Sequence, residues 1–202
     1  MLARPPWLLY RRLQTHQPHL HFTSTLSPQH PYTHHIASKQ PVQVVQSRYA
    51  ASMSSTTEAI ATQLFARDPI PQLEPGKKVY DPKLAKTIAS LDEHEYVKAA
   101  LHLANDDIHN CHEIAQAHEG DTIADILHAT LHRREGDYWN SKWWWSRIPA
   151  HPTIKSVADS KAFVDACERL NGTGSKEEDE LRERQWDELK GLVEFTRGKY
   201  GK

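Results

Sequence analysis

Apolar residues recur every three or four positions along most of the chain beyond residue 81. Leu84, Ile88 and Leu91 open this pattern, and later stretches repeat it with polar residues between the apolar ones. This period matches one face of an α-helix, and no stretch has the strict alternation and β-branched richness of a strand. The pattern therefore predicts an all-α domain over residues 81–202.

Residues that start and end helices divide this region into elements. Asp81 followed by Pro82 is a typical helix start, and Asp107 and Asp137 stand where later helices should begin. Gly136 is a typical helix-ending residue. We expect about six or seven helices in one domain, the first two starting near Pro82 and Asp92 and the others at about 108–118, 122–135, 138–148, 156–170 and 176–197.

The residues just before this domain are rich in helix breakers. Pro69, Pro71, Pro75 and Gly76 fall within a short span. Proline lacks a backbone N–H and has a fixed φ angle, so clusters of proline and glycine favour turns and extended chain. We therefore expect residues 53–80 to form an extended lead-in to the helical domain.

The first 52 residues have the composition of a mitochondrial transit peptide. From Met1 to Thr57 the chain has five Lys or Arg and no Asp or Glu. Its apolar run near the N-terminus is too short for a secretory signal or a membrane span. We expect location in the mitochondrial matrix after cleavage near Arg48, with a cytosolic form starting at Met53 as an additional product. A basic tail without a targeting role is the alternative interpretation.

The charge of the chain limits its expected partners, and its cysteine content limits disulfides and cysteine metal sites. Because the first 57 residues hold five of the 25 Lys and Arg but none of the 26 Asp and Glu, the remainder of the chain is acidic. Nucleic acid is therefore not an expected partner, since phosphate binding needs a basic face. Cys111 and Cys167 are too few and too far apart for a disulfide framework or a paired-cysteine metal site.

Two stretches separated by 30 residues match each other around a histidine. The identical pairs are Ala99/Ala129, Leu101/Leu131, His102/His132, Asp107/Asp137 and Asn110/Asn140. The match predicts two related helical hairpins, each of which turns after its histidine and restarts at its aspartate. If the hairpins stack, His102 and His132 become equivalent neighbours.

The second hairpin resembles half of a tetratricopeptide repeat. The run Gly136-Asp137-Tyr138, followed by Ser141, Trp145 and Pro152, stands in the order of that motif. Asp125 occupies the place of the repeat's bulky opening residue, and the period is 30 residues rather than about 34. The resemblance implies stacked, tetratricopeptide-like helical hairpins.

The segment from His128 to Trp145 is also similar to the signature of a second family. It reads HATLHRREGDYWNSKWWW, and the family consists of small uncharacterised helical proteins that share HxxxHRREGDY followed by a Trp-rich helix. The similarity extends over roughly residues 96–152. It implies a helical fold and carries no activity with it.

Ionisable side chains crowd the two hairpins. His128, His132 and Glu135 are four and three residues apart, so they share one stripe of a helix. Together with His102 they are candidate metal ligands, because imidazoles and carboxylates on facing helices form the metal sites of helical bundles. Zinc or iron is the metal that this set would take. The alternative is structural, with each imidazole donating across a turn to the aspartate that starts the next helix.

The same region offers candidate catalytic groups. The candidate acids and bases are His102, His112 and His132. Arg134 could bind an anionic substrate. Because successive helical residues point about 100° apart, only one of Arg133 and Arg134 can face a given pocket, and the other is expected on the surface. The alternative for these arginines is a structural salt bridge to a carboxylate such as Asp106.

Tryptophan is concentrated just after this site. Tyr138, Ser141 and Trp145 share a helical face that should enter the core, whereas Trp139 and Trp143 lie on another face. Large aromatic side chains outside the core are typical of partner surfaces. Burial of all of them against later helices is the alternative.

Two functional hypotheses follow. The first is a helical-hairpin interaction or adaptor module of mitochondria, which would bind a protein or peptide through Trp139 and Trp143. The second is a small metal-assisted or acid–base enzyme whose His, Asp, Glu and Arg residues form a site between the hairpins. The repeat and the acidic charge favour the first, whereas the density of ionisable residues favours the second. We expect no membrane span.

Overall fold

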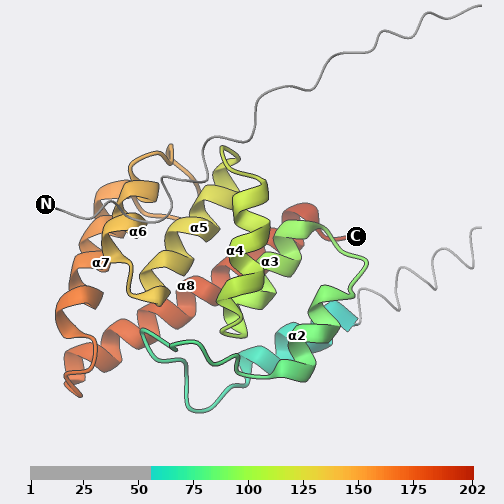
Figure 1. Cartoon of the computed structure of the whole chain (residues 1–202), viewed down its shortest axis with the longest axis horizontal. Coiled ribbons are helices and arrows are strands. Elements are labelled where there is room, and N and C mark those ends of the chain that lie inside the picture. Colours follow the sequence, from blue (N-terminus) through green and yellow to red (C-terminus); the bar gives the residue numbers. More distant parts are fainter. Residues whose placement is uncertain (1–55) are drawn as a thin grey trace, which may run out of the picture. The chain divides into compact units, whose positions relative to one another are not determined.

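The helices predicted beyond residue 81 form in the predicted order in the computed structural model, which describes residues 56–202 (Figure 1). They are α2 (Pro82–Ala89), α3 (Glu95–Ala104), α4 (Ile108–Ala117), α5 (Thr122–Glu135), α6 (Tyr138–Trp145), α7 (Val157–Leu170) and α8 (Lys176–Tyr200). Residues 56–202 contain no strand, so the all-α prediction is confirmed. The predicted transit peptide of residues 1–52 and the start at Met53 lie outside the described residues.

A further helix precedes these at residues 56–65. The prediction that residues 53–80 are extended is therefore wrong for this part, and the described chain has eight helices rather than six or seven. Ile60, Ala61 and Leu64 are buried in the main core, so this segment folds as an amphipathic helix against the domain. The proline-rich stretch between this helix and α2 has no helix and consists of turns, bends and irregular chain.

The helix starts follow the capping residues closely. Asp81, Asp107 and Asp137 are the N-caps of α2, α4 and α6, as predicted. The side chains of Asp107 and Asp137 accept hydrogen bonds from the backbone N–H groups of Asn110 at 3.4 Å and Asn140 at 3.2 Å. The hairpins α3–α4 and α5–α6 thus begin their second helices with matching caps.

The turns of the two hairpins use the same left-handed backbone. Gly136 ends α5 with φ at 78°, and Asp106 stands at the equivalent position of the first hairpin with φ at 57°. A residue other than glycine is strained at such a φ angle, and this conformation persists where surrounding contacts hold the residue in place. Asp106 is held by salt bridges to Arg67 and to Arg134, the latter at 2.6 Å.

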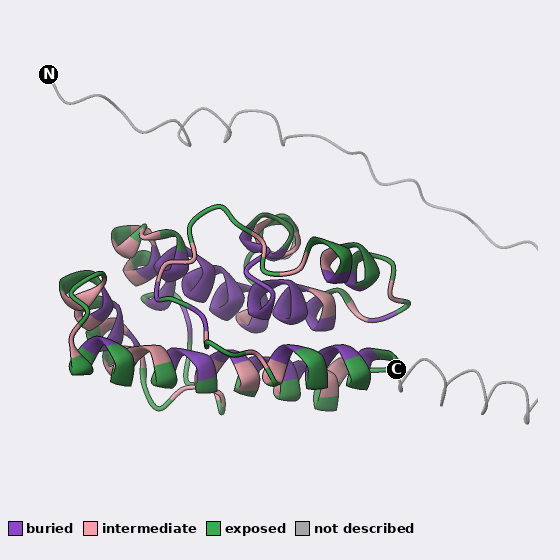
Figure 2. Cartoon of the chain, turned by 90° about the horizontal axis from the view of Figure 1, so that it is seen from below, coloured by how far each residue is buried: buried purple, intermediate pink, exposed green. Residues whose placement is uncertain are grey.

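Helix α5 is the most buried element of the domain. Every residue from Ile123 to Arg134 is buried. Helices α4 and α6 pack against α5, α3 packs against α4 and α8, and α7 packs against α6 and α8. Figure 2 shows the buried residues gathered on the inner helices, while the outer side of the long helix α8 is exposed. Side chains on α5 are therefore enclosed by their neighbours. In residues 56–202, no helix combines the length and the apolar character that crossing a membrane requires.

Candidate metal centre

Three histidines come together where α4 packs on α5. His128 and His132 are one turn apart on α5, and His112 reaches them from α4. One side-chain nitrogen from each lies within 4.8 Å of the other two. His128 and His132 are buried, whereas His112 is partly exposed. The helical spacing predicted the first two, and the packing of the hairpins adds the third.

The spacing of the ring nitrogens is close to that of metal ligands. His128 Nε2 and His112 Nε2 are 3.2 Å apart. Two nitrogens bound to a tetrahedral zinc ion at about 2.1 Å are about 3.4 Å from each other. This pair is thus already at ligand spacing, while the ring of His132 is stacked on that of His128 with centroids 4.8 Å apart.

Glu135 orients the third histidine instead of joining the group. Its Oε2 lies 2.9 Å from Nδ1 of His132. This contact leaves Nε2 of His132 as the nitrogen that can bind a metal, and carboxylates commonly hold ligating histidines in this way. The side-chain nitrogen of Asn140 lies 3.2 Å from that Nε2. The structure therefore makes Glu135 a neighbour of the predicted metal ligands and not a member of the cluster.

Two of the three imidazoles have lowered pKa values, which favours the neutral form that binds metals. Burial, followed by the nearby His132 and His112, lowers the pKa of His128 to about 2. Burial also lowers the pKa of His112, with a smaller effect from His132. The ring of Trp144 stacks on His128 with centroids 3.9 Å apart, which closes one side of the site to water. Within the described chain, the buried Nδ1 of His128 has no hydrogen-bond partner.

His102 lies outside this cluster, so its prediction as a metal ligand is not supported. Its Nδ1 is 2.8 Å from Oδ2 of Asp107, and the side chain is almost fully buried. The ring is thus bonded across the turn to the aspartate that starts the next helix. This is the structural alternative predicted from the sequence, and it holds for His102 alone.

The two arginines of α5 are structural. Arg134 donates to the carbonyl of Leu103 at 2.7 Å and to Oδ1 of Asp106 at 2.6 Å, which confirms the predicted salt bridge and not an anion site. Arg133 is only 1% exposed, so the prediction that one arginine lies on the surface is wrong. It bonds Glu188 on α8 at 2.6 Å. Both arginines are buried because α5 has packed neighbours on several sides.

The tryptophans of α6 divide as the helical pattern predicted. Trp139 is 64% exposed and Trp143 is 38% exposed, whereas Trp144 and Trp145 are buried. The guanidinium of Arg147 lies 4.6 Å from the ring centre of Trp143. Binding of a partner at this face stays a prediction.

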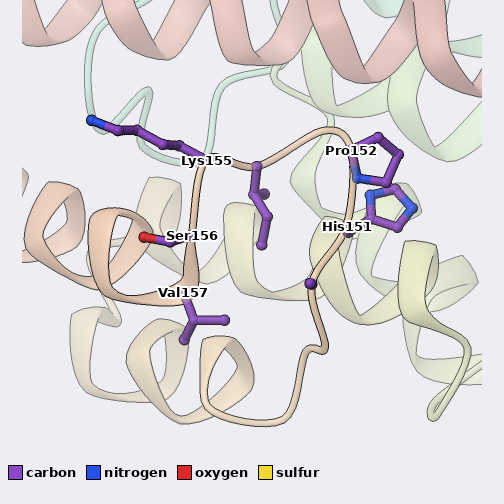
Figure 3. A pocket seen from close by; sticks show the side chains of 7 residues that line it. His151, Pro152, Lys155, Ser156 and Val157 are labelled. Atoms are coloured by element: carbon purple, nitrogen blue, oxygen red, sulfur yellow. The ribbon is translucent and has the colours of Figure 1, made fainter.

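A surface pocket lies away from the histidines, along the loop between α6 and α7. Figure 3 shows His151 and Pro152 on one arm of this loop and Ser156 and Val157 on the other. None of the three clustered histidines lines it. The pocket therefore adds no residue to the candidate metal centre.

Comparisons with known protein families, with curated proteins and with solved structures find no match to the chain. The two family resemblances in the sequence stay predictions. Function must be argued from the arrangement of side chains in the candidate metal centre.

Proposed function

We propose that the domain binds a divalent transition-metal ion, zinc in the first instance, through His112, His128 and His132. The observation that supports this most is the convergence of three imidazole nitrogens within 4.8 Å. Imidazole is a ligand for zinc, copper, iron and nickel. Structural zinc sites usually have four protein ligands, whereas catalytic sites have three. A three-histidine centre therefore favours the hypothesis of a small metal-assisted enzyme.

The surroundings of the cluster suit this role. Glu135 fixes the ring of His132 through its Nδ1, and Trp144 packs against the face of His128. A buried metal would experience a low local dielectric, which strengthens its polarising effect on a bound group. The chain's part is then to hold three imidazoles in place on two packed helices.

Metal binding by the full-length protein tests the proposal. Titration with cobalt(II), which has a visible spectrum, should show one ion per chain, and zinc should displace it. His112→Ala and His132→Ala should each weaken binding about 100-fold or more, since each removes one of three ligands. Far-ultraviolet circular dichroism checks that the variants remain helical.

A matched control lies on the same helix as His112. His109 is exposed on α4, one turn away, and is not part of the cluster. His109→Ala should bind cobalt as the parent does. Equal loss in all three variants, or no stoichiometric binding by the parent, would overturn the proposal.

The exposed tryptophans support a second candidate function. Trp139 and Trp143 are exposed on α6. In this proposal, α6 is part of a pair of stacked, tetratricopeptide-like hairpins. Such a face would serve as a binding surface for a protein or peptide. A photo-crosslinking amino acid at position 139 should then capture a defined partner in cells, while the same group at the exposed position 187 should not. Equal capture from both positions would contradict this function.

Mitochondrial location is also part of the proposal, and it is supported by the composition of the first 52 residues. The mature chain should start between Arg48 and Met53. Sequencing the N-terminus of the protein isolated from mitochondria checks this, and a chain that still starts at Met1 would contradict it.

A further inference from the structure

We propose that the three-histidine centre takes its fourth ligand from outside the chain, as a small monovalent anion, and that the amide of Asn140 donates a hydrogen bond to that anion. This inference rests on the proposed metal site and specifies what the site binds. It makes Asn140 a residue that contacts the ligand, in addition to the three imidazoles.

The first step is the number of protein ligands. The cluster contains His112, His128 and His132, and no fourth His, Cys, Asp or Glu among residues 56–202 belongs to it. Glu135 is the nearest predicted candidate, and it is engaged with Nδ1 on the other side of the His132 ring. A zinc or cobalt ion that prefers four ligands would therefore have one position for an external group.

The second step is access to that position. One side of the cluster is closed by Trp144, which is 5% exposed and stacked on His128. His112 on α4 and Asn140 on α6 are both partly exposed. An external ligand would thus reach the site past these two partly exposed side chains.

The third step is the location of Asn140. Its side-chain nitrogen is 3.2 Å from Nε2 and 3.5 Å from Nδ1 of His132, so it lies beside the ring and not in line with the Nε2 lone pair. An amide N–H group is a hydrogen-bond donor and not a metal ligand, and in this position it leaves the lone pair of Nε2 open to a metal. A donor at this place would then face the negatively charged fourth ligand.

The internal repeat shows that this contact is specific to the second hairpin. Asn110 is the equivalent of Asn140, and its side-chain nitrogen donates to Oδ2 of Asp107 at 2.7 Å. Asn110 therefore completes the cap of its own helix. Asn140 instead directs its amide to His132, although its backbone N–H bonds Asp137 in the same way.

Azide binding to the cobalt-loaded, full-length protein tests the inference. Adding sodium azide should change the visible spectrum in a saturable way, because an anion that enters the coordination sphere alters the ligand field. Asn140→Ala should weaken azide binding about tenfold, the fold-change expected from losing one hydrogen bond to a charged group. Cobalt affinity should change less than about threefold, since Asn140 is not a metal ligand.

Two further variants sharpen the experiment. Asn110→Ala removes the equivalent amide of the first hairpin and should leave azide affinity unchanged. Asn140→Asp places a carboxylate beside His132, so it should raise cobalt affinity and abolish the response to azide. Loss of azide affinity in Asn110→Ala equal to that in Asn140→Ala, or no loss in either, would overturn the role of Asn140.

The outcomes separate this inference from the proposed function. Cobalt binding without any spectral response to azide would overturn the external ligand while leaving the metal site in place. Failure to bind cobalt would overturn the metal site itself. A saturable response that weakens only in Asn140→Ala supports the whole inference.

Discussion

At the scale of single residues, the two hairpins place equivalent histidines in different contacts. His102 bonds Asp107 at the start of the next helix, whereas His132 bonds Glu135 within its own helix. The residue equivalent to Glu135 in the first hairpin is Asn105, which cannot serve as a carboxylate partner. Both histidines thus have a carboxylate on Nδ1, and in the described chain His132 also lies beside two other imidazoles whereas His102 lies outside that cluster.

Removing the carboxylate of Glu135 should weaken metal binding. Glu135→Ala should lower cobalt affinity about 10- to 100-fold, because the ring of His132 loses the partner that fixes its orientation. Glu135→Gln retains a side-chain oxygen and should have a smaller effect. Titration followed by the visible spectrum gives both values. Glu113→Ala, at an exposed position on α4, is the control, and a similar loss there would contradict the role of Glu135.

The buried carboxylate of Asp106 should make Arg134 important for stability. Arg134→Met leaves Asp106 with Arg67 as its remaining cation and should lower the free energy of unfolding by about 3 kcal/mol. In an Asp106→Gly background the carboxylate is absent and the left-handed backbone suits glycine, so the same change should cost less than half as much. Urea denaturation of the four proteins measures this coupling. Additive effects would contradict it.

At the scale of elements, local signals predicted the helices well because caps and breakers act locally. The bounds of α5 were predicted correctly as Thr122 to Glu135, with Gly136 as the residue that ends it. The start of α3 was not, because its N-cap is His94, whose Nδ1 accepts from the backbone of Tyr96 at 3.2 Å. The helix at 56–65 was missed although its apolar spacing was present, since the nearby prolines suggested extended chain over the whole segment.

The two equivalent caps should differ in their contribution to stability. Replacing an N-cap aspartate with alanine usually costs about 0.5–2 kcal/mol. Asp137→Ala should fall in this range. Asp107→Ala should cost more, because Asp107 also bonds the buried His102 and the side chain of Asn110. Thermal denaturation of the two variants gives the comparison, and a larger effect at Asp137 would contradict it.

At the scale of the whole molecule, the candidate site depends on how the hairpins pack. His128 and His132 could be paired from their spacing alone. The place of His112 in the cluster, and the absence of His102 from it, follow from the contact between α4 and α5, which no local pattern encodes. The burial of Arg133 against Glu188 on α8 has the same cause, since those residues are 55 apart in the sequence.

A metal that joins α4 to α5 should stabilise the folded domain as a whole. A ligand that binds only the native state adds about 2.7 kcal/mol to the free energy of unfolding when its free concentration is 100 times Kd. For a domain of this size, that corresponds to a rise in Tm of roughly 5–10 °C. Differential scanning calorimetry with and without zinc should show this rise in the parent and in His109→Ala. His132→Ala should show none, because two imidazoles cannot close the site, and an equal rise in that variant would place the bound metal elsewhere.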